Sequence, residues 1–263
     1  MGSVGRRNVN APVLKLASPP IVEAVVDIDC DMPPGLDIKA LESTARDAFQ
    51  AQYPKFRTQL IHEHQFKQEI GAPPEMSVRS GVQALRFFQE DEKQLVQVRT
   101  QGFSFNRLAP YSSLDDYLPE VERTWRLFLR VAAPVRIRLI RLRYINRILL
   151  PLKAEGVNLD RYLKLGPRLP DKKNLSFTGF LQQYSAMQVG TRNQANILLA
   201  AQPVENERLP IIFDIEAIAP DPVDPEDWSK IRIGIESLRN LKNIVFRNSL
   251  TKRCLKLFQH GMS

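Results

Sequence analysis

The chain has 263 residues, 43 % of them apolar and 25 % charged, which is an ordinary composition for a folded globular protein. No apolar run is long enough to cross a membrane, and the polar residues 1–10 lack the apolar core of a secretory signal, so we expect a cytoplasmic protein. Cys30 and Cys254 are too few and too far apart for a disulfide framework or a zinc cluster. The composition therefore predicts neither a metal nor another cofactor.

The net charge of +8 is distributed unevenly along the chain. Residues 1–114 carry 13 Lys or Arg against 13 Asp or Glu, whereas residues 115–263 carry 24 against 16. The whole basic excess therefore lies in the second part of the chain. This asymmetry favours an anionic partner for that part.

The first half predicts a strand at 21–29, released by Pro19-Pro20, and then a helix of about fifteen residues capped by Asp37. Strands are predicted at 56–70, 82–89 and 95–108, and the last two form a hairpin around Asp91-Glu92-Lys93. A helix at 114–131 follows, with apolar residues on one side.

The same order then recurs. A strand is predicted from Pro134 to residue 148, a short helix around 158–165, strands at 175–187, 193–201 and 210–218, and a long helix from about Pro225. We therefore predict an α+β fold with an internal pseudo-repeat. Two β-α-β-β-β-α halves, residues 1–134 and 135–263, form one continuous, mainly antiparallel sheet with helices on one face. This arrangement resembles the saddle of TATA-binding-protein-like folds, a likeness of fold that implies no function.

Arginines dominate the strand that opens the second half. Arg136 and Arg138 alternate with apolar residues, and the alternation slips at Leu139-Ile140. A β-bulge at the slip places Arg136, Arg138, Arg141, Arg143 and Arg147 on one face. Such a row suits phosphate, because guanidinium groups bind oxyanions through paired hydrogen bonds. The favoured alternative is ion pairing within the sheet, with Asp214 and Glu216 within reach.

The last helix carries both a basic and an apolar side. Its cations are expected on a solvated face: Lys230, Arg232, Arg239, Lys242, Arg247, Lys252, Arg253 and Lys256. Its apolar residues are spaced for burial: Trp228, Ile231, Ile235, Leu238, Leu241 and Val245. We expect them to pack on the protein's own sheet, and assembly into a homo-oligomer is the alternative.

Few residues favour catalysis. His62 and His64 share one face of a predicted strand and could share a metal, but no third ligand is evident nearby. Asp214 and Glu216 could hold a cation, yet ion pairing with arginines is favoured. Neither a phosphate-binding glycine loop nor a nucleophile motif is present in the sequence.

Two Asn-Arg pairs stand near strand ends. Asn106-Arg107 and Asn146-Arg147 are each followed by apolar residues and a proline. Asn146 falls on the apolar side of its strand, where a buried amide needs hydrogen-bond partners. We expect a structural role for it, and a place in a binding site is the alternative.

Five blocks of sequence carry a family resemblance: Pro-Ile-Val-Glu-Ala at 20–24, Val-Gln-Val-Arg at 96–99, Gly-Phe-Ser-Phe-Asn-Arg-Leu at 102–108, Pro-Tyr at 110–111 and Leu-Arg-Tyr-Ile-Asn-Arg-Ile at 142–148. With them the chain resembles a sporadically distributed, uncharacterised family of prokaryotic proteins. The resemblance implies no activity or catalytic residue. Sporadic distribution implies a setting such as phage defence or a toxin-neutralising module.

These observations favour a non-enzymatic binding or accessory protein whose basic second half engages a partner protein or nucleic acid. The expected contacts come from Arg136, Arg138, Arg141, Arg143, Arg147, Asn106, Arg107 and Asn146. The alternative is a metal-dependent nuclease or nucleotide-processing enzyme that uses Asp214, Glu216, His62 and His64.

Overall fold

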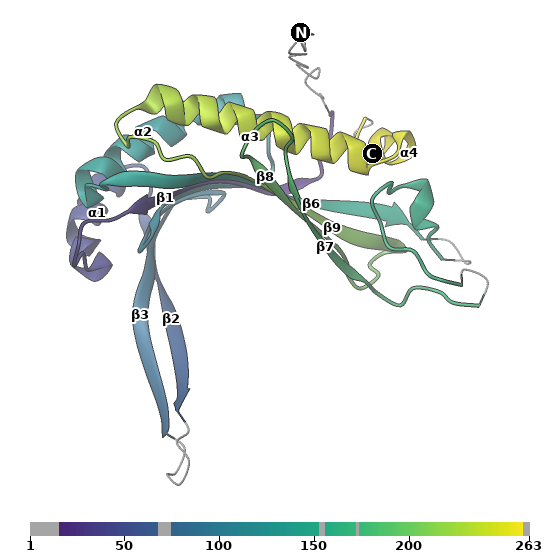
Figure 1. Ribbon diagram of the computed structural model, residues 1–263, viewed down its shortest axis with the longest axis horizontal. Helices are drawn as coiled ribbons and strands as arrows, with labels where there is room; N and C mark the ends of the chain where they lie inside the picture. The colour runs from purple at the N-terminus through teal and green to yellow at the C-terminus, as the bar shows by residue number, and fades with distance from the viewer. Residues whose placement is uncertain (1–15, 68–74, 153–155, 172–173, 260–263) are drawn as a thin grey trace, which may run out of the picture. The chain divides into compact units, whose positions relative to one another are not determined.

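A computed structural model describes residues 16–67, 75–152, 156–171 and 174–259, without the side chains of 62–80. The strands are β1 Ile21–Asp31, β2 Lys55–Lys67, β3 Glu75–Phe88, β4 Gln94–Arg99, β5 Gly102–Leu108, β6 Arg136–Pro151, β7 Leu181–Met187, β8 Gln194–Ala201 and β9 Arg208–Ala219. The α-helices are α1 Glu42–Phe49, α2 Leu114–Ala132, α3 Trp228–Ser249 and α4 Lys252–Lys256, with 3₁₀ turns at Ile38–Leu41 and Leu159–Arg161. Figure 1 shows the ribbon coloured from purple at the N-terminus to yellow at the C-terminus.

The strands form one sheet of nine strands in the order β2-β3-β4-β5-β1-β6-β9-β8-β7. In each half the opening strand, β1 or β6, lies beside the last strand of its own half, β5 or β9. The two opening strands are neighbours and join the halves. The predicted α+β class and the continuous antiparallel sheet are therefore confirmed.

The chain divides into two compact units. One unit comprises 25–140 and 220–231, and the other comprises 141–219 with the stretches before residue 25 and after residue 231. Boundaries fall inside β1, β6 and α3, so each of these elements contributes to both units.

In the unit of residues 25–140, α2 covers the sheet with the apolar side that the sequence predicts. Leu118, Val121, Trp125 and Phe128 are buried, and the ring of Trp125 meets the ring of Phe103 on β5 edge to face at 5.6 Å. The Trp125 indole N–H donates to the Pro225 carbonyl at 3.0 Å, so this large side chain is satisfied as well as buried. In Figure 1, β2 and β3 continue as a two-stranded ribbon beyond the segment 84–88 that pairs with β4.

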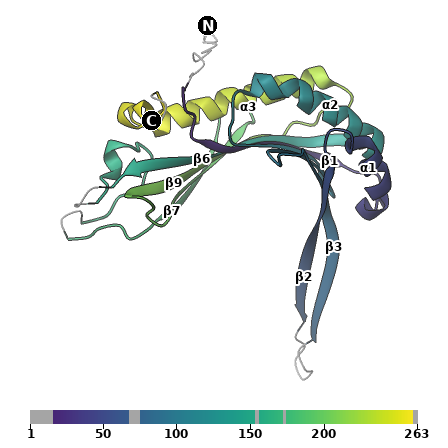
Figure 2. The ribbon, with the colours of Figure 1, turned by 180° about the vertical axis from the view of Figure 1, so that it is seen from behind.

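In the other unit, α3 packs on β9 and β6. Ile235, Leu238 and Leu241 are buried, and the Phe246 ring stacks on Phe213 of β9 at 5.8 Å. α4 adds Cys254 to the same core and follows α3 across one face of the strands (Figure 2). Packing of the last helix on the protein's own sheet is thus confirmed.

The elements differ from the sequence prediction in several places. β3 begins at Glu75 rather than at residue 82, and the helix predicted around 158–165 is only the 3₁₀ turn Leu159–Arg161. The strand predicted at 95–108 is two strands, β4 and β5, joined by a turn at Thr100-Gln101. The helix predicted from Asp37 begins as a 3₁₀ turn, with the Asp37 carboxylate accepting the Lys39 N–H at 2.9 Å as expected for a cap. β7 begins at Leu181 rather than at residue 175.

No helix in the described stretches is long and apolar enough to span a bilayer.

Gly102, at the turn between β4 and β5, lies too close to β1 to accept a side chain. Gly102 has φ +139°, and a Cβ there would lie 2.1 Å from the Ile28 carbonyl oxygen on β1. Gly35 also has positive φ, +74°, but nothing lies within 4 Å of its Cβ position. We expect Gly35→Ala to lower the free energy of unfolding by about 1–2 kcal/mol through backbone strain alone. Gly102→Ala should lower it by about 3 kcal/mol or more, because steric overlap adds to the strain.

Urea unfolding of both variants measures the difference. Equal losses for Gly35→Ala and Gly102→Ala would contradict the close approach of this turn to β1.

Candidate binding surface

The five arginines of β6 lie on the exposed side of the strand. Burial alternates along β6, with Ile137 inside, and the alternation shifts by one residue at Leu139-Ile140. From Ile140 to Leu150 the even-numbered residues are buried and the odd-numbered ones are half-buried. The shift occurs where the sequence predicts a bulge, and it keeps every arginine of the row away from the core.

Arg136 and Arg138 meet one carboxylate on β1. The Arg136 guanidinium donates twice to Asp31, at 3.0 and 2.7 Å, and the Arg138 Nε lies 3.5 Å from the other oxygen of the same group. Both arginine side chains remain exposed, so water screens these pairs.

Arg141 and Arg143 meet the two carboxylates of β9 that the sequence suggests. Arg143 donates to both oxygens of Asp214 at 2.5–3.0 Å, and the Asp214 side chain is only 12 % exposed. Arg141 Nε lies 3.9 Å from Glu216, whose carboxylate also accepts from the Asn196 amide at 2.9 Å.

Arg147 completes the row at the far end of β6. It donates to Gln202 at 3.1 Å and to the Glu205 carboxylate. Every arginine of the row therefore has a carboxylate partner within the fold. The ion pairing that the sequence analysis favours over a free guanidinium row is therefore what these side chains form.

The Asn-Arg pairs have internal roles. The buried Asn146 donates to the Phe213 carbonyl of β9 at 2.9 Å and so fixes β6 against β9, as expected of a structural residue. The buried Asn106 accepts from Gln97 of β4 at 2.8 Å. Arg107 lies with its guanidinium 5.0 Å from the centre of the Tyr117 ring, and its Nε has no hydrogen-bond partner among the described residues.

Among the residues that the structure describes, the candidate catalytic groups do not form a metal site. Among the described residues, no group of three or more His, Cys, Asp or Glu could hold a metal ion. The side chains of His62 and His64 lie outside the described part. Burial raises the pKa of Cys30 and of Cys254 to about 12, so neither thiol supplies a thiolate near neutral pH.

Lys242 of α3 departs from the solvated position that we expected. Its Nζ lies 3.9 Å from the centre of the buried Tyr144 ring on β6. Burial, with a contribution from Arg239, lowers the pKa of this amine to about 7. Lys242 follows Leu238 by four residues and so belongs to the apolar side of α3 rather than to its basic side.

A surface of a different kind lies in the second half. Residues 174–191 contain no Asp, Glu, Lys, Arg or His, although a quarter of the whole chain is charged. We call residues 174–191 the uncharged segment. Several of its large apolar side chains are exposed, namely Leu175, Phe177, Leu181, Met187 and Val189. Exposed apolar side chains gathered in one stretch indicate a contact surface.

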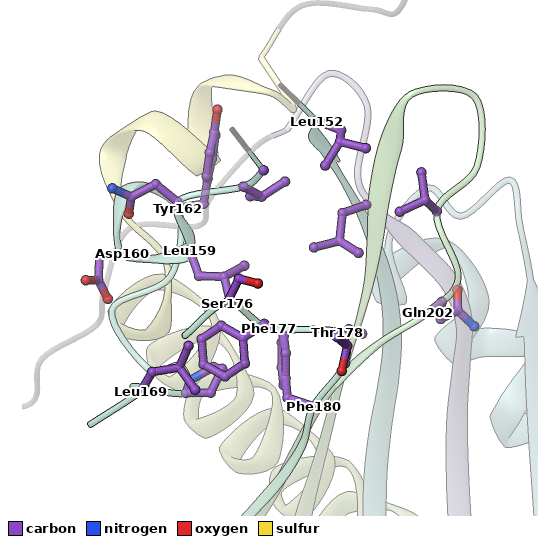
Figure 3. Close-up of a pocket in the computed structure, with 18 of the residues that line it drawn as sticks. Leu152, Leu159, Asp160, Tyr162, Leu169, Ser176, Phe177, Thr178, Phe180 and Gln202 are labelled. Carbon is purple, nitrogen blue, oxygen red and sulfur yellow. The ribbon is translucent and has the colours of Figure 1, made fainter. Parts of the chain in front are cut away.

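The first part of the uncharged segment lines a pocket of about 900 Å³ (Figure 3). Leu159 and Tyr162 form one side of it, and Leu169, Phe177 and Phe180 contribute apolar surface from the loop that leads to β7. Asp160 and Gln202 lie at opposite sides of the view in Figure 3, with the apolar side chains between them. Its volume falls within the range of ligand pockets.

Sequence reasoning missed this pocket because its wall comes from segments between 151 and 209 that only the fold brings together. The missing charge in 174–191 was the available signal. A second, smaller depression of about 220 Å³ is bordered by Arg143, Asp214 and Glu216, which are already engaged with one another or with neighbours.

The chain matches no known protein-family model and no curated protein. The resemblance to a sporadically distributed prokaryotic family therefore stays a prediction.

The pairing of Arg143 with Asp214 can be measured against an exposed pair. We expect a double-mutant cycle of Arg143→Ala and Asp214→Ala to give a coupling energy of about 1–2 kcal/mol. The Asp214 carboxylate is largely shielded from water and accepts hydrogen bonds from Arg143 on both of its oxygens. The helix pair Arg126–Glu122, at 2.7 Å and more exposed, should give about 0.3–0.5 kcal/mol.

Chemical unfolding of the single and double variants supplies both coupling energies. A coupling at Arg143–Asp214 no larger than that at Arg126–Glu122 would mean that the arginine remains available to other anions.

Proposed function

We propose that the protein is a non-enzymatic binding protein whose second half engages a partner protein through the apolar pocket and the uncharged segment beside it. The pocket is the observation that carries this proposal. Its lining joins Leu159 and Tyr162 of the buried core to the exposed Phe177, so a ligand side chain placed there would extend the core.

A polypeptide suits this pocket better than a small molecule does. Leu175 and Val204 line the pocket, yet they remain 50 % and 55 % exposed. A small ligand would leave these side chains in water, whereas a protein surface with one projecting apolar side chain covers them and fills the pocket together. Such anchor side chains dominate the energy of protein interfaces.

The charges favour a partner protein over nucleic acid. A protein binds a phosphate backbone with cationic side chains that displace the counterions of the nucleic acid. Each arginine along β6 already has a carboxylate partner and is therefore less suited to this role. A metal-dependent nuclease has less support, because Asp214 is held by Arg143 and Glu216 by Asn196. A place in a phage-defence or toxin-neutralising module, in which partner binding is the activity, agrees with this proposal.

A library of short random peptides displayed on phage tests the proposal directly. We expect selection on the immobilised protein to enrich peptides that carry a Phe, Leu, Ile or Met anchor. Thr178 lines the pocket and is exposed. Thr178→Arg brings a long charged side chain to the opening of the pocket. It should lower the affinity for the enriched peptides about tenfold or more, which is the effect of losing one buried apolar anchor.

Thr100→Arg is the matched control, since Thr100 is an exposed threonine in the β4–β5 turn of the other unit. It should bind the enriched peptides as the wild type does. No enrichment over the unselected library, or equal binding to Thr178→Arg and wild type, would contradict the proposal.

A further inference from the structure

The two edges of the sheet differ in their protection against pairing with another chain. β2 forms one edge and carries Lys55, Arg57, Glu63 and Lys67 in its sequence. β7 forms the other edge, belongs to the uncharged segment and contains neither a charged residue nor a proline. Natural sheets usually block exposed edges with charge, proline or bulges, so an unblocked edge indicates a pairing surface.

The register of β7 with β8 shows which backbone groups face outward. The Phe180 carbonyl accepts from Ala201 N–H at 3.0 Å, and Gln188 N–H donates to the Asn193 carbonyl at 2.8 Å. The register between these two pairs has no irregularity, so the even-numbered residues of β7 bond to β8. The N–H and C=O groups of Leu181, Gln183, Ser185 and Met187 therefore point to the open edge.

The side chains of the same four residues lie on one face of β7. Leu181 and Met187, at its two ends, are 69 % and 66 % exposed, and both are large and apolar. Between them stand the polar Gln183 and Ser185. The sequence of this face is thus apolar, polar, polar, apolar, which is the same pattern in both directions.

We propose that β7 pairs with β7 of a second copy of this chain, antiparallel about a two-fold axis at Tyr184. In this register Leu181 lies opposite Met187 of the second copy and Gln183 lies opposite Ser185. The outward N–H and C=O groups meet in hydrogen-bonded pairs, and Tyr184 faces its own copy in a pair without hydrogen bonds.

Charge explains why the contact forms at this edge. Two copies of a chain with a net charge of +8 repel each other, and the repulsion is smallest where the contacting surfaces carry no charge. Strand pairing here also covers Leu181 and Met187, two of the exposed apolar side chains of the uncharged segment. This contact does not depend on what occupies the pocket.

Sedimentation equilibrium of the whole chain tests the proposal through one backbone N–H. Gln183→Pro removes an outward N–H without touching the bonds to β8, and proline is tolerated on an edge strand. Gln183→Ala shortens the same side chain and keeps the N–H. We expect a wild-type dimer, a dissociation constant raised about tenfold or more by Gln183→Pro, and little change with Gln183→Ala.

A charge swap tests the register without relying on proline. Met187→Lys and Leu181→Glu should each weaken the dimer, since each places one charge against an apolar side chain. The double variant should regain most of the lost affinity, because the carboxylate introduced into one copy then faces the amine introduced into the other. Within one chain these two positions are about 20 Å apart and cannot pair.

A wild-type protein that stays monomeric at high concentration would overturn the proposal. A dissociation constant that Gln183→Pro leaves unchanged would also overturn it. So would a double charge variant whose loss of dimer affinity equals the sum of the losses of the two single variants. The Thr178→Arg variant should dimerise normally, so loss of pocket binding and loss of the dimer are separate results.

Discussion

The carboxylates opposite the arginines of β6 determine which surfaces of this protein are available for binding. Asp31 on β1 pairs with two arginines of the row, and Asp214 and Glu216 on β9 and Glu205 after β8 pair with one each. A guanidinium that is already paired offers less to a phosphate than an unpaired one does. The pairing therefore turns the most basic strand of the sequence into a structural element that holds neighbouring strands together.

With that face neutralised, the contrast between the charged and the uncharged parts of the second half becomes informative. Ion pairs and the Asn146 amide link β6 to β9. Beyond them, residues 174–191 carry no charge, line the pocket and then form the edge strand β7. One segment thus supplies the pocket that we propose for a partner protein and the edge that we propose for a second copy. If both places are occupied, each protomer of a symmetric dimer carries one partner protein.

Much of the fold follows from local patterns in the sequence. The apolar period of α2, the cap at Asp37 and the shift at Leu139-Ile140 all act over a few residues, and each was predictable. The turn at Thr100-Gln101 was missed because apolar alternation continues on both sides of it and only Gly102 marks the bend.

The site was less accessible to sequence reasoning. Asp214 and Glu216 were recognisable as partners from their alternation on one strand, whereas Asp31 requires the knowledge that β1 lies beside β6. Strand order in a sheet is set by long-range packing and leaves little local trace. The pocket likewise depends on loops brought together by the fold. The charge-free run at 174–191 was visible in the sequence, and it is the feature that identifies the surface.

The salt dependence of self-association tests most directly whether binding uses uncharged rather than arginine-bearing surfaces. An apolar, uncharged contact between like-charged molecules should hold or strengthen between about 50 mM and about 500 mM NaCl, because salt screens only the repulsion. Sedimentation equilibrium should therefore give a dissociation constant that is unchanged or lower at the higher salt. A dissociation constant that rises about tenfold over this range, as contacts between arginines and anions would produce, would contradict the account.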